Sequence, residues 1–163
     1  MKIIDNFLSK DEFKLVQRSM MSADFPWYFN DYTLGPGRSG YQFTHTFLSG
    51  TGNGSYSNFL SILQPIVDKL KVKKLIRIKA NLNPQTSIFN KGTGWHIDTN
   101  PPKLDQKTAI YYINTNNGYT QFKWRRKVKS IENRLVIFDA TTKHCGFTCT
   151  DKKSRVLVNF NYY

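Results

Sequence analysis

From Leu75 to the last residue, the sequence alternates between short strand-like segments and turns, and this pattern leaves few folds open. The expected strands span residues 75–82, 95–98, 108–114, 120–123, 127–131, 134–140, 145–149 and 155–163. Asn116, Asn117 and Gly118 mark a turn between two of them. Eight short strands after two helices predict an α+β, mainly β fold. We expect a double-stranded β-helix (jelly roll) with the N-terminal helices packed on one sheet.

Two helices are expected before these strands. Ser9 and Glu12 form the pattern of a capping box, in which each side chain accepts from the other residue's backbone N–H. A helix over residues 10–22 follows, with apolar residues at helical spacing at Phe13, Val16 and Met20. A second helix is predicted over residues 57–70, with Pro65 as a kink or break. Its apolar stripe comprises Phe59, Leu60, Leu63, Ile66, Val67 and Leu70.

The length of 163 residues predicts a single domain over residues 1–163. Residues 1–74 would supply helical support and a lid region, and residues 75–163 would form the jelly-roll core. Within the first part, glycine-rich turn zones flank an extended segment carrying Tyr41, Phe43, His45 and Phe47 on one face. The segment over residues 33–57 is therefore either a lid over a site or an ordinary surface excursion.

Composition favours a soluble, cytoplasmic protein. No apolar stretch is long enough for a transmembrane helix, and the first residues lack the apolar region of a signal peptide. Cys145 and Cys149 are the two cysteines. Four residues along a strand would place them about 13 Å apart, too far for a disulfide, so both are expected to be free thiols.

The net charge of +13 admits a polyanionic partner or a membrane surface. An alternative is a lysine- and asparagine-rich composition produced by AT-rich coding, with no functional meaning. The basic cluster over residues 123–129 contains Trp124, and it is interpreted either as a nucleic-acid contact or as a basic hairpin tip. Nucleic acid is thus a candidate partner, but not the favoured one.

A histidine and an aspartate two residues apart carry the main functional signal. On an extended segment, His96 and Asp98 would point to the same face and could reach one metal ion. His144, on another expected strand, offers a third ligand, and Arg155 follows eleven residues later. Two imidazoles and one carboxylate form the facial triad of non-haem Fe(II) sites. Arg155 would then offer bidentate donors to the far carboxylate of a 2-oxo acid.

The last strand separates polar from apolar residues. One face carries Arg155, Leu157, Asn159, Asn161 and Tyr163, and the other carries Val156, Val158, Phe160 and Tyr162. We expect the second face to pack on the helices. The first face needs partners for its polar groups if it lies inside a barrel, and a ligand carboxylate on Arg155 would supply one.

These segments resemble the 2-oxoglutarate- and Fe(II)-dependent oxygenases of the prolyl 4-hydroxylase-like group, including small members encoded by phages and bacteria. The similarity rests on residues 92–98, 110–114, 133–138 and 155–160 and on His144. Tyr112 lies sixteen residues after His96, as in animal oxygen-sensing prolyl hydroxylases.

This resemblance implies that His96, Asp98 and His144 bind iron and that Arg155 and Tyr112 bind 2-oxoglutarate. The implied cofactors are Fe(II), 2-oxoglutarate as co-substrate and O2, with ascorbate as a further candidate. A phage origin would place the protein in the host cytoplasm.

Two departures from the family pattern concern asparagines. Where those hydroxylases have a tyrosine before a proline, this chain has Asn83 before Pro84, so that contact with the co-substrate is either an amide or absent. Nucleic-acid dealkylases carry a second arginine six residues after the first, and this chain has Asn161 there. Asn159, on the same face of the last strand, is a further candidate for co-substrate binding.

Other interpretations of single residues stay open. His144 could be a structural histidine, and Arg155 could pair with Asp139 or Asp151 instead of a ligand. Trp95 and Trp124 are interpreted as packing residues. His45 is interpreted as packed among aromatic side chains, with substrate contact as the alternative.

The predicted function is hydroxylation of a substrate C–H, with 2-oxoglutarate converted to succinate and CO2. A prolyl or other residue in a peptide or protein is the first choice of substrate, and a small molecule is the second. One alternative is a non-catalytic jelly-roll module that binds nucleic acid or glycan. Another is a nucleic-acid-modifying oxygenase with the same metal centre. Oligomeric state is not predicted.

Overall fold

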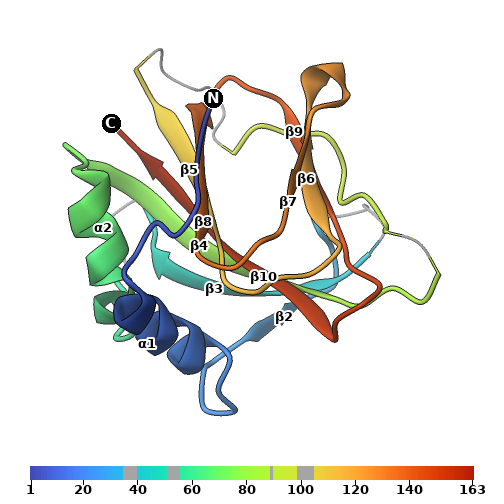
Figure 1. The fold of residues 1–163 in the computed structure, drawn as a ribbon, viewed down its shortest axis with the longest axis horizontal. Helices are drawn as coiled ribbons and strands as arrows, with labels where there is room; N and C mark the ends of the chain where they lie inside the picture. The colour runs from blue at the N-terminus through green and yellow to red at the C-terminus, as the bar shows by residue number, and fades with distance from the viewer. Residues whose placement is uncertain (35–39, 51–55, 89, 99–104) are drawn as a thin grey trace.

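Two antiparallel sheets pack against each other in the computed structural model, which describes residues 1–34, 40–50, 56–88, 90–98 and 105–163 (Figure 1). The large sheet has the strand order β1 (Lys2–Ile4), β8 (Arg134–Asp139), β5 (Lys107–Tyr112), β10 (Ser154–Tyr162), β4 (Leu75–Pro84), β3 (Gln42–Leu48) and β2 (Tyr28–Asn30). The small sheet has the order β7 (Lys127–Lys129), β6 (Tyr119–Phe122) and β9 (His144–Phe147). The predicted mainly β fold with two antiparallel sheets is confirmed.

Both helices form where expected, with one change. Helix α1 (Lys10–Met20) begins with the predicted capping box, in which Ser9 N donates to Glu12 Oε2 over 3.0 Å. The second segment is a 3₁₀ turn, η1 (Leu60–Leu63), followed by helix α2 (Gln64–Leu70). The predicted kink or break at Pro65 takes the form of a break, because the 3₁₀ turn ends at Leu63 and Pro65 lies in the first turn of α2. First-turn N–H groups have no acceptor within the helix, so proline loses nothing there.

The helices cover one face of the large sheet, and the small sheet covers the other (Figure 1). On the helix side, the predicted apolar face of β10 is buried in the core, together with residues of α1 and α2; this set includes Val156, Val158, Phe160, Tyr162, Phe13, Val16 and Ile66. On the other side, Leu157 joins a smaller cluster with Phe122 of β6 and Val128 of β7. The alternation of β10 thus assigns its polar face to the space between the sheets.

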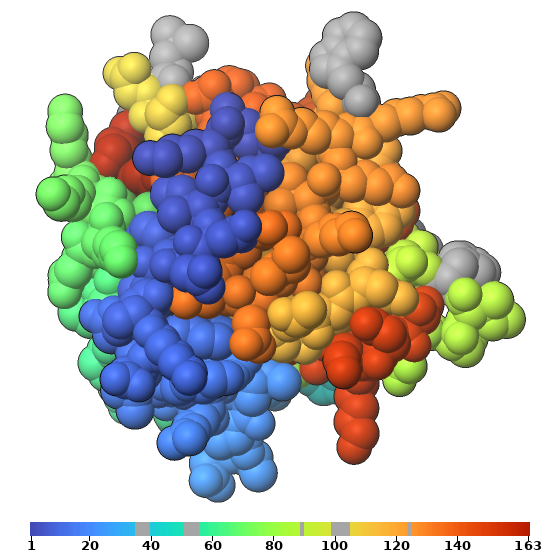
Figure 2. Space-filling view, in the orientation of Figure 1, coloured from blue at the N-terminus to red at the C-terminus, as the bar shows by residue number. Residues whose placement is uncertain are grey.

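Asn133 attaches the N-terminal segment to the large sheet. Its side chain accepts from Leu8 N and donates to Leu8 O, each over 2.9 Å, and Tyr111 donates to its Oδ1 over 2.7 Å. Strand β1 pairs with β8 directly beyond this point, and Figure 2 shows the blue N-terminal segment lying against the orange segment. These contacts give Asn133 a structural role at the start of the segment at residues 133–138.

The sheet also includes strands from the predicted support region. Strand β3 pairs with β4 and β2, and these pairings occupy much of the segment expected as a lid at residues 33–57. Its two glycine-rich zones, at residues 35–39 and 51–55, lie outside the described residues. The expected strand at residues 95–98 does not form, because His96 alone makes a backbone bridge there.

Three smaller expectations concern the surface and the thiols. Cys145 and Cys149 are both free, as predicted, and both are buried. The basic cluster connects β6 to β7 through a 3₁₀ turn, η2 (Lys123–Arg125), which agrees with a basic hairpin tip. Among the helices of the described residues, none has the length and hydropathy needed to cross a bilayer.

Candidate active site

A pair of backbone hydrogen bonds places the two candidate histidine ligands side by side. His96 N donates to His144 O, and His144 N donates to His96 O, each over 3.0 Å. This reciprocal bridge adds the His96 segment to the edge of β9, and the two imidazole centroids lie 4.5 Å apart. The turn before His96 requires Gly94, which has a φ of +107° and approaches Leu34 so closely that a Cβ would lie 2.6 Å from Leu34 Cδ1.

Both imidazoles present the same nitrogen to the site. His96 Nδ1 lies 3.0 Å from Gly94 O, and His144 Nδ1 lies 3.1 Å from Thr142 O. A carbonyl oxygen can only accept a hydrogen bond, so each Nδ1 carries the proton and each Nε2 is left with a lone pair. This is the tautomer in which a histidine ligates a metal through Nε2.

Asp98 completes the candidate metal centre. Its Oδ1 lies 3.6 Å from His96 Nε2 and 3.8 Å from His144 Nε2, and the three ligand atoms lie within 4.8 Å of one another. Two atoms that each bind one ion at roughly 2.1 Å can be no more than about 4.2 Å apart, so both distances to Asp98 already fit a shared ion. The 4.8 Å limit for all three atoms is wider, so the two imidazole nitrogens would move slightly closer around a shared ion. The donor set suits a divalent metal, and two imidazoles with one carboxylate favour Fe(II).

Asn161 holds the other oxygen of Asp98. Its Nδ2 lies 3.5 Å from Asp98 Oδ2 and donates to Thr108 Oγ1 over 3.1 Å. Such an outer contact fixes the orientation of a ligating carboxylate. The asparagine that departs from the dealkylase pattern thus supports the metal ligand.

Electrostatic coupling among the three ligands shifts their pKa values. Burial opposes ionisation of Asp98, but His96 and His144 outweigh it and lower its pKa to about 2. Burial also opposes protonation of His96, yet its contact with the Asp98 carboxylate raises the pKa of His96 overall. At His144 burial dominates and lowers the pKa. The site is thus anionic at Asp98 at neutral pH, as a cation site requires.

Arg155 lies fully buried in the same space, with a relative exposure of 1%. Its Nε donates to Ser130 Oγ over 2.7 Å and its Nη2 donates to Thr120 Oγ1 over 2.9 Å. Gly118 leaves room for this side chain, since a Cβ there would lie 2.6 Å from Arg155 Cδ. Neither Asp139 nor Asp151 is its partner among the described residues, so the alternative ion pairs are excluded.

A cavity of about 360 Å³ connects Arg155 with the metal ligands. Twenty described residues line it: Tyr32, Thr33, Leu34, Gln42, Arg77, Lys79, Asn81, Asn83, Thr93, Trp95, His96, Ile97, Asp98, Ile110, Thr120, His144, Gly146, Arg155, Leu157 and Asn159. The buried Oδ1 atoms of Asn159 and Asn161 accept no hydrogen bond from any described residue. Asn159 lines the cavity, and an orphaned acceptor there is the mark of a site that a ligand or water completes.

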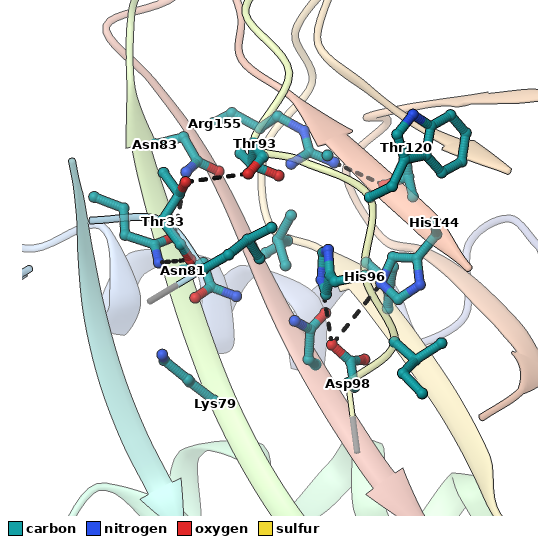
Figure 3. A pocket seen from close by; sticks show the side chains of 18 of the residues that line it. Thr33, Lys79, Asn81, Asn83, Thr93, His96, Asp98, Thr120, His144 and Arg155 are labelled. Atoms are coloured by element: carbon teal, nitrogen blue, oxygen red, sulfur yellow. Dashed lines mark hydrogen bonds and ion pairs between the residues drawn. The ribbon is translucent and has the colours of Figure 1, made fainter. Parts of the chain in front are cut away.

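The predicted co-substrate residues are placed unequally. Asn83 and Asn159 line the cavity, but Tyr112 does not. Its hydroxyl donates to Thr120 Oγ1 over 2.8 Å, and Thr120 is the residue that faces the cavity (Figure 3). Direct contact between Tyr112 and 2-oxoglutarate stays a prediction.

Two other aromatic predictions have different outcomes. Trp95 is 49% exposed and lines the cavity, so the interpretation as a packing residue is wrong. His45 is buried away from the cavity, with its ring nitrogens 2.8 Å from Pro26 O and 2.7 Å from Ser57 Oγ. The packing interpretation of His45 is thus confirmed.

Sequence reasoning missed a row of polar side chains on β4. Arg77, Lys79 and Asn81 line the cavity beside Asn83, at every second position of the strand. Burial lowers the pKa of Lys79, and the charge of Arg77 acts in the same direction. Their alternation was visible in the sequence, but only the pairing of β4 with β10 shows that this face points into the cavity.

Comparison with solved structures gives the fold a family context. No family model matches the sequence, and no curated protein sequence matches it. A 2OG-Fe(II) oxygenase family oxidoreductase from Burkholderia pseudomallei superposes with a TM-score of 0.71 at 11% identity, covering 98% of this chain and 84% of that one. The chain has the 2OG-Fe(II) oxygenase fold.

Two prolyl hydroxylases also share this oxygenase fold. The enzyme from Trichoplax adhaerens, solved with a hypoxia inducible factor peptide fragment, matches with a TM-score of 0.69 at 15% identity, over 99% of this chain and 82% of that one. The viral collagen prolyl hydroxylase of Paramecium Bursaria Chlorella virus-1, solved with 2OG, matches with a TM-score of 0.61 at 14% identity, over 99% and 94%. The oxygenase fold of this chain therefore occurs in bacterial, animal and viral enzymes.

Proposed function

We propose that this protein is an Fe(II)- and 2-oxoglutarate-dependent dioxygenase that hydroxylates a substrate C–H. The observation that carries the proposal is the convergence of His96, Asp98, His144 and the buried Arg155 on one polar cavity. Its fold, shared with 2OG-Fe(II) oxygenases, supports the assignment without fixing the substrate.

Each residue has a role in this proposal. His96, Asp98 and His144 would hold the metal through Nε2, carboxylate and Nε2. Iron held there supplies the reduction of O2 coupled to oxidative decarboxylation, with one oxygen atom entering succinate and the other forming the substrate hydroxyl. Arg155 would bind the far carboxylate of 2-oxoglutarate, because its guanidinium is fixed by Ser130 and has donors left over.

The asparagines complete the co-substrate site. Asn83 pairs with Arg155 across β4 and β10, so an amide stands beside the guanidinium where the family has a tyrosine. Asn159 lies between Arg155 and the metal ligands along β10, with its amide facing the cavity. An asparagine amide has both a donor and an acceptor, so its NH2 group can donate to the 2-oxo acid and its oxygen can accept from water.

The substrate is proposed to be a prolyl or other residue in a peptide, with a small molecule as the second choice. A peptide is present in the similar Trichoplax enzyme, and the exposed Trp95 at the cavity offers a surface that could contact one.

Succinate formation tests the proposed reaction. Iron-loaded protein incubated with 2-oxoglutarate and air is expected to release succinate and CO2 in equal amounts, with turnover rising when a substrate is added. The reaction should stop when iron is replaced by Zn(II). Undiminished turnover in the His96→Ala variant would show that the activity does not belong to this site.

Thr120 is expected to matter more than Tyr112 for 2-oxoglutarate binding. Thr120 Oγ1 accepts from both Tyr112 and Arg155, so its own hydroxyl hydrogen is free to donate to a ligand in the cavity. Thr120→Val should weaken 2-oxoglutarate binding about tenfold, and Tyr112→Phe by no more than about threefold. Calorimetric titration of the zinc-loaded variants measures both. The reverse order would make Tyr112 the direct ligand.

Metal binding should weaken as the pH falls. A proton and a metal compete for Nε2 of each histidine. Because the pKa of His96 is raised above its ordinary value of about 6.5, competition begins above that pH, whereas the lowered pKa of His144 delays its competition. Zinc affinity, measured against a chromophoric chelator, should fall about tenfold per pH unit below the pKa of His96. Constant affinity between about pH 8 and pH 6 would contradict this assignment.

A further inference from the structure

Arg77 and Lys79 form a cationic pair inside the cavity with no carboxylate partner. Both lie on β4, two residues apart, and their side chains share the cavity-lining face. All eleven acidic residues of the chain belong to the described part of the structure, and none forms an ion pair with either cation there. No described residue accepts a hydrogen bond from them. Two half-buried cations without partners are costly unless a bound anion compensates them.

This pair lies at the opposite end of the cavity from Arg155. Strand β10 aligns Arg155 with Asn83, Asn159 with Lys79, and Asn161 with Arg77. Four residues along a strand correspond to about 13 Å, so the backbone positions of Lys79 and Arg155 lie at different ends of the cavity. Figure 3 shows Asn83 near Arg155 at one end and Lys79 level with Asp98 at the other.

Charge balance argues against 2-oxoglutarate as the partner of these cations. A divalent metal, the Asp98 carboxylate, the Arg155 guanidinium and a doubly ionised 2-oxo acid carry no net charge together. The charges of Arg77 and Lys79 therefore stay unmatched after the proposed metal and co-substrate have bound. Asp98 attracts both cations but forms an ion pair with neither, and its single charge is already counted in this balance.

We propose that Arg77 and Lys79 bind an acidic group of the primary substrate and place it beside the metal. This inference rests on the proposed oxygenase function and names its substrate class: a carboxylate-bearing molecule, whether a free acid or an acidic residue next to the oxidised position of a peptide. Arg77 can clamp a carboxylate through two parallel N–H donors, and Lys79 adds a point charge two residues along the same strand. Asn81, the next residue on this face, can donate to the same group.

Matched acid and amide probes test the proposal. Zinc-loaded protein saturated with 2-oxoglutarate, which cannot turn over, is titrated with N-acetyl amino acids and their primary amides. A second arm uses acetyl-Ala-Xaa-Glu-Ala-amide peptides and their Gln counterparts, with Xaa varied. Dissociation constants are compared in the natural protein, Arg77→Gln and Lys79→Gln, with Lys73→Gln as a control on an exposed lysine outside the cavity.

The acidic member of a bound pair is expected to bind at least about tenfold more tightly than its amide. Lys79→Gln and Arg77→Gln should each reduce this preference to about threefold or less, while Lys73→Gln leaves it unchanged. If the preference appears with the N-acetyl amino acids, the substrate carboxylate belongs to a free acid. If it appears with the peptides, the carboxylate belongs to an acidic residue. Affinity for 2-oxoglutarate should stay within about threefold in both variants.

Three results would overturn the inference while leaving the oxygenase function intact. One is a panel in which no acid binds better than its amide. Another is a preference that survives in both variants. A third is a loss of 2-oxoglutarate affinity in Lys79→Gln as large as that in Arg155→Gln, which would assign Lys79 to the co-substrate. Failure of the natural protein to bind 2-oxoglutarate would instead refute the proposed function, and this inference with it.

Discussion

The Asp98→Ala variant is expected to lose tight metal binding and all 2-oxoglutarate turnover. Asp98 supplies the only carboxylate of the candidate centre, and its charge lowers the cost of placing a divalent cation beside two half-buried or buried imidazoles. Loss of an outer partner of a metal ligand alone costs roughly 10- to 100-fold in affinity, so loss of the ligand should cost about 100-fold or more. Metal content after loading and dialysis measures this directly.

Asp139→Ala serves as the matched control for this variant. Asp139 is exposed and pairs with Lys107 on the surface, so its removal should leave metal content unchanged. The Asp98→Ala variant should also lower the pKa of His96, since the contact with Asp98 is the main cause that raises it against burial. Natural metal affinity in folded Asp98→Ala protein would rule out the three-residue site.

The second large effect is expected at Arg155. Arg155→Gln should weaken 2-oxoglutarate binding at least about 30-fold. Loss of one member of a buried, hydrogen-bonded charge pair costs roughly 2 kcal/mol or more, which corresponds to that factor. Metal binding should change little, since the arginine contacts none of the described metal ligands. Calorimetry on zinc-loaded protein separates the two affinities.

Two further variants show what the Arg155 effect means. Arg155→Lys retains the charge but not the bidentate geometry, so it should recover only part of the lost affinity. Arg134→Gln removes an arginine that pairs with Asp5 on the surface, and its 2-oxoglutarate affinity should match that of the natural protein. Equal binding by Arg155→Gln and the natural protein would remove this residue from the co-substrate site.

The features of the fold and site that could be predicted from the sequence are those that depend on residues close together in the chain. The alternation of β10 separated Val156, Val158 and Phe160 from the cavity face, because side chains in a strand alternate whatever it pairs with. The capping box of Ser9 and Glu12 was equally local. His96 and Asp98 could be paired because residues two apart on an extended segment share a face, and the structure adds His144 to them.

The parts that escaped prediction depend on long-range pairing. Strand β3 forms because its residues align with β4, and no property of the glycine-flanked segment indicates that partner. Residues 95–98 were extended enough to bring His96 and Asp98 together, but only His96 pairs with β9. Arg77 and Lys79 were part of a predicted strand, yet their position in the cavity follows only from the register of β4 against β10.

The measurement that tests the central claim most directly is the anaerobic addition of Fe(II), followed by 2-oxoglutarate, to the metal-free protein. Chelation of the metal by the 2-oxo acid is expected to produce a visible metal-to-ligand charge-transfer band. The band should be absent in His144→Ala, which loses a metal ligand, and greatly reduced in Arg155→Gln at the same 2-oxoglutarate concentration. A folded protein that binds Fe(II) but gives no band with 2-oxoglutarate would contradict the proposed co-substrate and with it the proposed reaction.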